Sequence, residues 1–205
     1  MSTPHFSLAA DRNKQAIFDV LRQVLPARGQ ALEIASGTGQ HVAWFAAGLE
    51  HWTWQPTDAL PAAIGSIASW AAEQDLPNVC PPLVLDVMAS GWLPADQRFD
   101  LIYCANMLHI SPWATCAALM QGSARQLAPS GQLIIYGPYF ERDVPASEGN
   151  IAFDQSLRTQ NLAWGIRCLE DVAQVAAQAG LQLHARHAMP ANNLLLIWRA
   201  AEQLL

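Results

Sequence analysis

The sequence predicts an α/β protein built on a doubly wound, mostly parallel, seven-stranded sheet with helices on both faces and a terminal antiparallel strand. Strand-like and helix-like segments alternate through five strands, as in parallel sheets. Residues 98–108 form a nearly continuous apolar run, typical of a strand covered on both faces. The last two strand-like segments, 181–189 and 193–200, lie too close for a crossover helix, so they pair antiparallel or flank another strand.

The composition fits one domain spanning residues 1–205. Hydrophobic residues make up 52% of the chain and charged residues 14%, which excludes global disorder. The net charge is −6 and the 11 Lys and Arg residues are scattered, so no basic surface for nucleic acid is expected.

The four cysteines form no CxxC pair and have no histidine at ligand spacing, so we expect small buried thiols and no metal site. No N-terminal apolar signal and no uninterrupted apolar run of membrane length is present. These features predict a soluble cytoplasmic protein with a small-molecule substrate and no membrane partner. They do not indicate an oligomeric state.

In the first part of the chain a helix is expected over 11–25, with Asp11 as its cap and Pro26 as its stop. Two strand–helix units follow. Their predicted strands and helices are 30–36, 39–50, 51–58 and 60–74, the last entered through Pro61.

In the second part, strands are expected at 81–87, 98–108 and 131–140. A helix over 113–127 precedes the last of these, and a helix over 168–179 ends at Gly180.

The turn Ser36-Gly37-Thr38-Gly39 follows the first strand and favours close approach of a ligand to the backbone. A dinucleotide fingerprint would need a third glycine where Val42 stands. Glu33, inside the strand, would repel a pyrophosphate but attract a cationic sulfonium or amino group. Asp58, ending the second strand, is a suitable acceptor for the two hydroxyls of a ribose, or alternatively a cap for the next helix.

Several stretches together resemble the DUF938 family, the methyltransferase-like 26 group, of the class I S-adenosylmethionine-dependent methyltransferases with a Rossmann-like fold. They include AADRNKQAI, LEIASGTGQH, WQPTD, NVCPPLVLDV, NMLHISPW and MPANN. The resemblance covers about residues 7–199 and implies S-adenosylmethionine as cofactor, with S-adenosylhomocysteine as product. Ala35 stands where a first glycine is common in the superfamily.

The resemblance also implies site residues. Gly37 and Gly39 would let the main chain approach the methionine moiety, near Glu33, and Asp58 would accept from the ribose. The cofactor-binding residues implied are Glu33, Ser36, Gly37, Gly39, Asp58, Asp86, Val87 and Asn106.

The segment after the fourth strand carries the candidate catalytic residues Asn106 and His109, at the sheet edge where ligands collect. Methyl transfer needs alignment and, for some acceptors, proton removal, which a histidine can perform. Alternatively, His109 packs against the next helix, and Asn106 holds either the acceptor or the cofactor.

Residues 138–166 show little periodicity and are expected to form a lid or substrate loop. Tyr139, Arg158, Trp164 and Arg167 are candidate substrate-binding residues. The arginines either clamp an anionic acceptor or pair with nearby acids. Asn192, in the turn before the last strand, either reaches the same opening or only shapes the turn.

The sequence therefore predicts a methyltransferase that acts on an unidentified small-molecule acceptor. Two alternatives stay open: a nicotinamide-dependent oxidoreductase, and a non-catalytic S-adenosylmethionine-binding sensor or scaffold.

Overall fold

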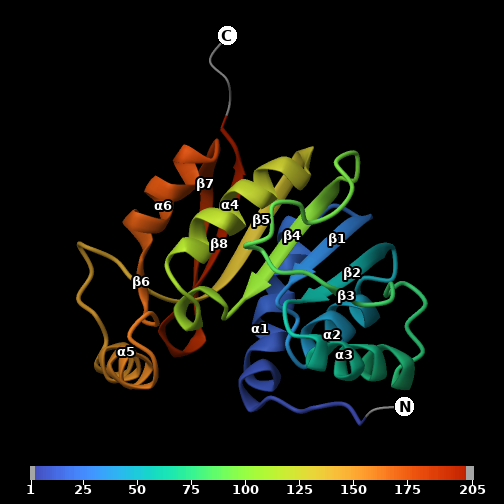
Figure 1. Cartoon of the computed structure of the whole chain (residues 1–205), viewed down its shortest axis with the longest axis horizontal. Helices are drawn as coiled ribbons and strands as arrows, with labels where there is room; N and C mark the ends of the chain where they lie inside the picture. The colour runs from blue at the N-terminus through green and yellow to red at the C-terminus, as the bar shows by residue number, and fades with distance from the viewer. Residues whose placement is uncertain (1–2, 202–205) are drawn as a thin grey trace.

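The computed structural model describes residues 3–201, and its centre is one twisted sheet (Figure 1). The strand order is β3-β2-β1-β4-β5-β8-β7, and a short strand, β6, pairs with the end of β5. The strands are β1 (Gly29–Ile34), β2 (Trp52–Asp58), β3 (Leu83–Val84), β4 (Phe99–Ala105), β5 (Leu127–Phe140), β6 (Arg167–Cys168), β7 (Leu181–Met189) and β8 (Asn193–Ala200).

The pairing confirms the predicted fold class. Strands β1 to β5 pair in parallel, whereas β8 runs antiparallel to both β5 and β7. The two closing strands therefore form a hairpin, which settles the alternative that the sequence left open.

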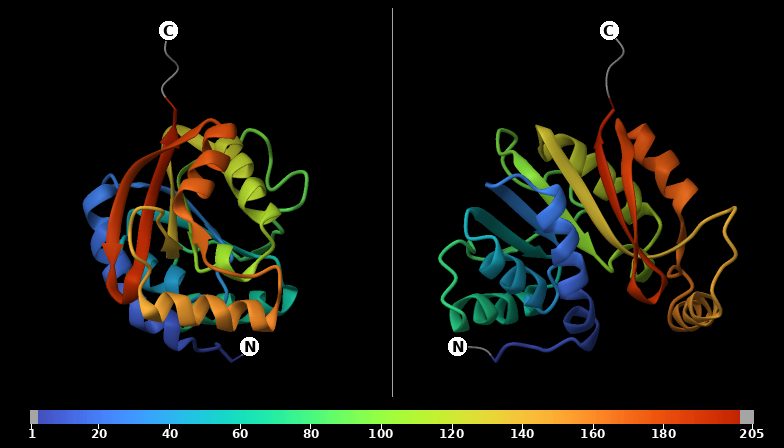
Figure 2. Two further views of the ribbon diagram at one scale, coloured as in Figure 1. Left: turned by 90° about the vertical axis from the view of Figure 1, so that its left-hand side faces the viewer. Right: turned by 180° about the vertical axis from the view of Figure 1, so that it is seen from behind.

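Helices cover both faces of this sheet (Figure 2). They are α1 (Leu8–Val24), α2 (Gln40–Gly48), α3 (Pro61–Glu73), α4 (Ala114–Gln126), α5 (Glu148–Gln160) and α6 (Leu169–Gln178), with 3-10 turns η1 (Leu108–Ile110) and η2 (Pro190–Asn192). The helices α1, α2 and α3 pack on one face around Phe45, Trp54 and Ile67. The other face packs Leu119 of α4 and Val172 of α6 against β4, β5 and β8. Among the described helices, none is long and apolar enough to cross a membrane.

Some boundaries differ from the prediction. Helix α1 begins at Leu8 because the Ser7 hydroxyl accepts from the Ala10 N–H, whereas Asp11 pairs with Lys14 inside the first turns. Strand β3 is only two residues long, so Asp86 lies beyond it. Residues 129–131, which we expected to end the helix over 113–127, instead lie in an irregular start of β5.

The predicted irregular segment 138–166 contains a 13-residue helix, α5, capped by the Ser147 hydroxyl. The helical periodicity of its apolar residues is weak because Ile151 and Phe153 are exposed and Leu157 is the main buried apolar residue of the helix. Whether the segment acts as a lid stays a prediction.

The chain turns from β1 toward β2 on one side and from β4 toward β5 on the other. Strands β1 and β4 are adjacent, so the direction of winding changes between them. Ligands of doubly wound sheets bind outside the carboxyl ends of the strands at such a switch point.

Candidate functional site

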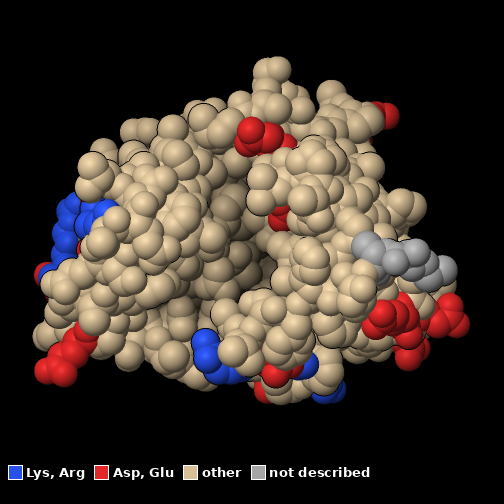
Figure 3. Space-filling view, turned by 60° about the horizontal axis from the view of Figure 1, so that its bottom comes forward, with Lys and Arg blue, Asp and Glu red and all other residues tan. Residues whose placement is uncertain are grey.

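A cavity of about 1400 Å³ opens at this switch point and appears as the deep hollow in Figure 3. One part, which we call the Asp58 half, is lined by residues 34–38, 58–60 and 85–88. The other, the His109 half, is lined by residues from 105–115, 136–138, 149–153 and 190–193. The start of α1 lines the cavity as well. The volume exceeds the usual range for one drug-sized ligand, so two molecules fit.

The glycine turn after β1 has a left-handed backbone at Ala35, Gly37 and Gly39, with φ of 54°, 58° and 91°. A Cβ at Gly37 would meet nothing within 4 Å, so this position faces open space in the cavity wall. A Cβ at Gly39 would lie 2.7 Å from the Cα of Ile67. Gly39 does not line the cavity, and its missing side chain allows α3 to pack against the turn.

Asp58 ends β2 with a nearly buried carboxylate in the cavity wall. One oxygen accepts from the Gly37 N–H at 2.9 Å and the other from the Leu60 N–H at 2.9 Å. The bond to Leu60, directly before α3, agrees with the capping interpretation, and the ribose contact stays a prediction. The two bonds fix the carboxylate, and each oxygen retains a lone pair for a ligand.

Asp86 and Val87 follow β3 and line the same half of the cavity. The Asp86 carboxylate is exposed and accepts from the Met88 N–H at 2.9 Å, while Val87 is buried. An apolar wall beside backbone and carboxylate acceptors suits a flat heterocycle.

Glu33 lies beneath the turn, 1% exposed, and does not line the cavity. Burial raises its pKa to about 7, against the lowering effect of a hydrogen bond with Ser36. One carboxylate oxygen has no hydrogen-bond partner among the described residues. Ser36 does line the cavity, and its hydroxyl also accepts from the Thr57 N–H.

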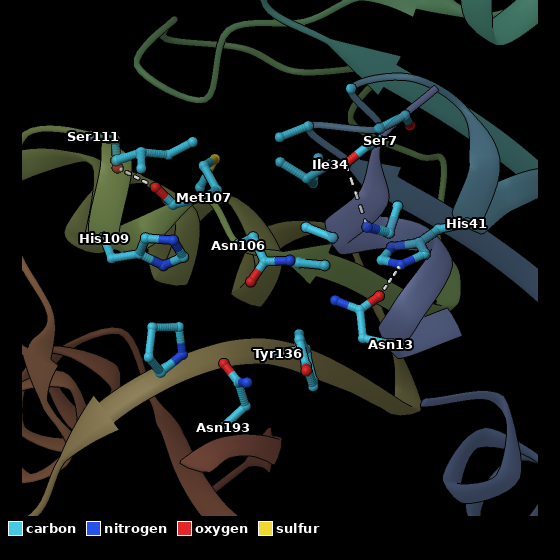
Figure 4. A pocket seen from close by; sticks show the side chains of 18 of the residues that line it. Ser7, Asn13, Ile34, His41, Asn106, Met107, His109, Ser111, Tyr136 and Asn193 are labelled. Carbon is cyan, nitrogen blue, oxygen red and sulfur yellow. Dashed lines mark hydrogen bonds between the residues drawn. The ribbon is translucent and has the colours of Figure 1, made fainter. Parts of the chain in front are cut away.

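Asn106 and His109 both line the cavity, and their side chains lie on the same side of it (Figure 4). Asn106 has a left-handed backbone, with φ of 57°, and its N–H donates to the Tyr136 carbonyl. Burial, aided by Arg167, lowers the pKa of His109 to about 4, so its ring is neutral at pH 7. The ring lies edge-on to Phe153 of α5, 5.6 Å between centroids.

A polar chain along one wall of the cavity was not predicted. The Nε2 of His41 lies 2.7 Å from the Asn13 Oδ1, and its Nδ1 lies 3.3 Å from the Tyr103 hydroxyl. Burial lowers the pKa of His41 to about 4. Burial raises the pKa of Tyr136, which lines the cavity, and the neighbouring Asn13 opposes this rise. No sequence motif signals this chain, because its members come from α1, α2 and β4.

Only some of the candidate substrate-binding residues line the cavity. Asn192 lines the cavity, as does its neighbour Asn193. Tyr139, Arg158, Trp164 and Arg167 do not, so the substrate roles predicted for these four are not supported by their positions.

Each of these four has another environment. Tyr139 is buried in the core beneath α4 and α6. Arg158 pairs with Asp154 at 2.8 Å, as the second interpretation expected. Arg167 donates to the carbonyls of Leu108, Ser111 and Ala163 and thereby holds η1 in place. Trp113 stacks under Arg167 outside the cavity lining.

Helix α5 supplies the wall residues Asn150 and Phe153 in their place. The Asn150 amide donates to the Asn192 carbonyl at 3.1 Å, which ties the helix to the β7–β8 turn. A Ser-x-x-Asn cap at residues 147–150 was the available signal for this helix.

The family model for DUF938, a protein family of unknown function, matches residues 4–200. The chain belongs to this family. The match confirms the resemblance inferred from the sequence motifs.

Solved structures of O-methyltransferases share the fold. An O-methyltransferase family protein from Burkholderia thailandensis matches with a TM-score of 0.77 at 19% identity, over 95% of this chain and 58% of that one. NcsB1, an O-methyltransferase from neocarzinostatin biosynthesis in complex with S-adenosylmethionine and 2-hydroxy-5-methyl naphthoic acid, matches with 0.76 at 15%, over 94% and 54%. An O-methyltransferase family 2 protein from Planctomyces limnophilus, in complex with apigenin, matches with 0.76 at 20%, over 94% and 58%.

The DUF938 chain spans a little more than half the length of these relatives. At such identities the likeness shows a methyltransferase fold, with its mostly parallel sheet and one antiparallel strand.

Proposed function

We propose that this protein is a methyltransferase that moves a methyl group from S-adenosylmethionine to a small-molecule acceptor. The observation that carries the proposal is the fixed Asp58 carboxylate at the end of β2, facing the switch-point cavity beside the open Gly37 position. A carboxylate held by two backbone N–H groups is a preorganised acceptor for a vicinal diol.

The residues of the Asp58 half fit such a cofactor. Asp58 would hold the ribose, Asp86 and Val87 the adenine, and Ser36 and Gly37 the methionine part. Glu33 would act from beneath the turn on the sulfonium or amino group, whose positive charge favours the ionised form of this acid. One of its oxygens has no hydrogen-bond partner among the described residues. Gly39 would support the turn by packing rather than by contact.

The cofactor would supply an electrophilic methyl group, which bonds to the acceptor's lone pair as the carbon–sulfur bond breaks and the sulfonium becomes a thioether. The chain's own part is alignment. Asn106 lies between the two halves and would orient the acceptor or the cofactor by its amide. The neutral His109 ring would take a proton from an acceptor that carries one on the attacked atom.

Two further observations support this proposal. NcsB1 is described in complex with S-adenosylmethionine and a naphthoic acid, which are one cofactor and one small acceptor in a chain of the same fold. The DUF938 cavity is large enough for two molecules of that kind.

Calorimetric titration with S-adenosylhomocysteine and with NAD tests the cofactor. We expect micromolar binding of S-adenosylhomocysteine and none of NAD, because Val42 replaces the third glycine and is fully buried. Tighter binding of NAD would overturn the proposal. Binding of S-adenosylmethionine without turnover of a broad acceptor panel would instead support a sensor.

Should an acceptor be found, His109→Gln tests the base. The variant should lower turnover by about 100-fold, the range of general base catalysis, and leave the affinity for S-adenosylhomocysteine unchanged.

A further inference from the structure

The His109 half of the cavity contains no ionised side chain among the described residues that line it. The lining includes three ionised groups: Asp58 and Asp86, which lie in the other half, and Arg12, which is exposed on α1. The walls of the hollow in Figure 3 are accordingly almost free of red and blue. His41 and His109 are both neutral at pH 7, since burial lowers each pKa to about 4.

Two cations on segments beside this half, Arg167 and Arg158, are already engaged. Arg167 donates to three backbone carbonyls, and Arg158 is paired with Asp154. Neither lines the cavity. Arg12 lines the cavity from α1 but is exposed to solvent. A carboxylate or phosphate that enters the His109 half would therefore lose its hydration without gaining a buried counter-ion, and a buried charge without a partner is costly.

Uncharged hydrogen-bonding groups take the place of charges. The amides of Asn106 and Asn193 and the Tyr136 hydroxyl converge on the same space (Figure 4). The Asn193 amide nitrogen donates to the carbonyls of Pro190 and Ala191, which leaves its oxygen as the group available to a ligand. That oxygen accepts from a hydroxyl or N–H.

The remaining walls are apolar. Met107, Pro138 and Pro190 line this half, and Phe153 stands edge-on to the His109 ring. Phe153 is 42% exposed, so a bound molecule would cover apolar surface that now faces solvent. Flat rings pack well against such aromatic and proline surfaces.

We propose that the acceptor, on the basis of the methyltransferase function proposed above, is an uncharged ring compound bearing a hydroxyl or N–H group that donates to Asn193. Apolar contact with Phe153 and the prolines provides affinity. The amide and hydroxyl groups select the polar substituent, and the lack of counter-ions rejects anionic analogues.

Two matched compounds test this inference: methyl 6-hydroxy-2-naphthoate, which is neutral, and 6-hydroxy-2-naphthoic acid, which is ionised near neutral pH. Each is titrated by calorimetry into the full chain, with and without S-adenosylhomocysteine. We expect the ester to bind at least about tenfold tighter than the acid. Equal or tighter binding of the acid, or no binding of either compound, would overturn the inference.

A pair of lysine variants on α5 locates the effect. Phe153→Lys adds a cation to the cavity wall and should shift the preference toward the acid by about tenfold or more. Ile151→Lys adds the same charge on the same helix at an exposed position outside the cavity lining and should leave the preference unchanged. Equal shifts in the two variants would contradict a site in the His109 half.

The proposed methyltransferase function is tested separately, by the binding of S-adenosylhomocysteine. Failure of S-adenosylhomocysteine to bind would overturn the proposed methyltransferase function. The preference between ester and acid, measured without it, would still decide the chemistry of the His109 half.

Discussion

The two halves of the cavity are built in different ways. The Asp58 half comes from the ends of β1, β2 and β3 within residues 34–88, and backbone hydrogen bonds fix its acid. The His109 half is assembled from four separate segments between residues 105 and 193. Strand order thus fixes the wall residues of the Asp58 half, whereas the wall residues of the His109 half are placed by the packing of α5 and the β7–β8 turn.

The two glycines of the Asp58 half should respond very differently to alanine. Gly39→Ala should destabilise the fold by about 2–4 kcal/mol, because its Cβ would lie 2.7 Å from the Ile67 backbone and its φ is 91°. Gly37→Ala should cost about 1 kcal/mol, from φ alone, and mainly weaken cofactor binding. Denaturant unfolding measures both. Equal losses would refute the packing role of Gly39.

The buried acid beneath the glycine turn, Glu33, should make stability depend on pH. In the folded protein Glu33 has a pKa of about 7 against an ordinary 4.5, so it retains a proton that the unfolded chain loses. Stability is therefore lost as the pH rises from 4.5 through 7.

Glu33→Gln should remove this loss. It should raise the unfolding free energy by about 2–3 kcal/mol near pH 8 and change it little below pH 4.5. Unfolding titrations of both proteins across this range provide the measurement, and parallel curves would show that Glu33 is not the responsible group.

Asp58→Ala should weaken S-adenosylhomocysteine binding by about 1.5–3 kcal/mol, the range for hydrogen bonds to a charged group. Asp100→Ala is the matched control, because that carboxylate also accepts a backbone N–H, from Gln30, yet does not line the cavity. It should lower stability but keep affinity. If a folded Asp58→Ala protein binds S-adenosylhomocysteine as tightly as the wild type, the Asp58 carboxylate serves only its bonds to the Gly37 and Leu60 N–H groups.

The smallest effect is expected outside the cavity. Arg158→Ala breaks a half-exposed ion pair and should cost at most about 0.5 kcal/mol. Arg167→Ala removes three bonds to carbonyls that hold η1 and should cost about 1–3 kcal/mol. Thermal unfolding ranks the two variants. If a stable Arg158→Ala protein loses acceptor binding, the hypothesis that Arg158 binds an anionic acceptor would be supported instead.

Much of the Asp58 half could be predicted from the sequence. Strand ends follow from apolar periodicity, so the amino-acid sequence alone indicates that Gly37 and Asp58 lie at neighbouring strand ends. The role of Gly39 could not be predicted, because the residue that it accommodates, Ile67, belongs to a helix far along the chain.

The His109 half was only partly predictable. His109, Asn106 and Asn192 follow strands or connect them, and all three do line the cavity. Phe153 and Asn13 were missed because their places depend on tertiary packing of α5 and α1. The sequence left two roles open for the arginines, an anion clamp or pairing with nearby acids, because composition does not reveal which groups lie beside them. In the fold, Arg158 pairs with Asp154 and Arg167 bonds the η1 carbonyls.

The turn carrying Asn192 and Asn193 has a consequence for biosynthesis. The elements of the Asp58 half have all been synthesised once the ribosome has passed residue 88, while the other wall must wait for the final hairpin. Domains generally begin to fold during synthesis from the N-terminal side. Nascent chains of increasing length should therefore gain adenosine-type binding well before they can hold a second molecule.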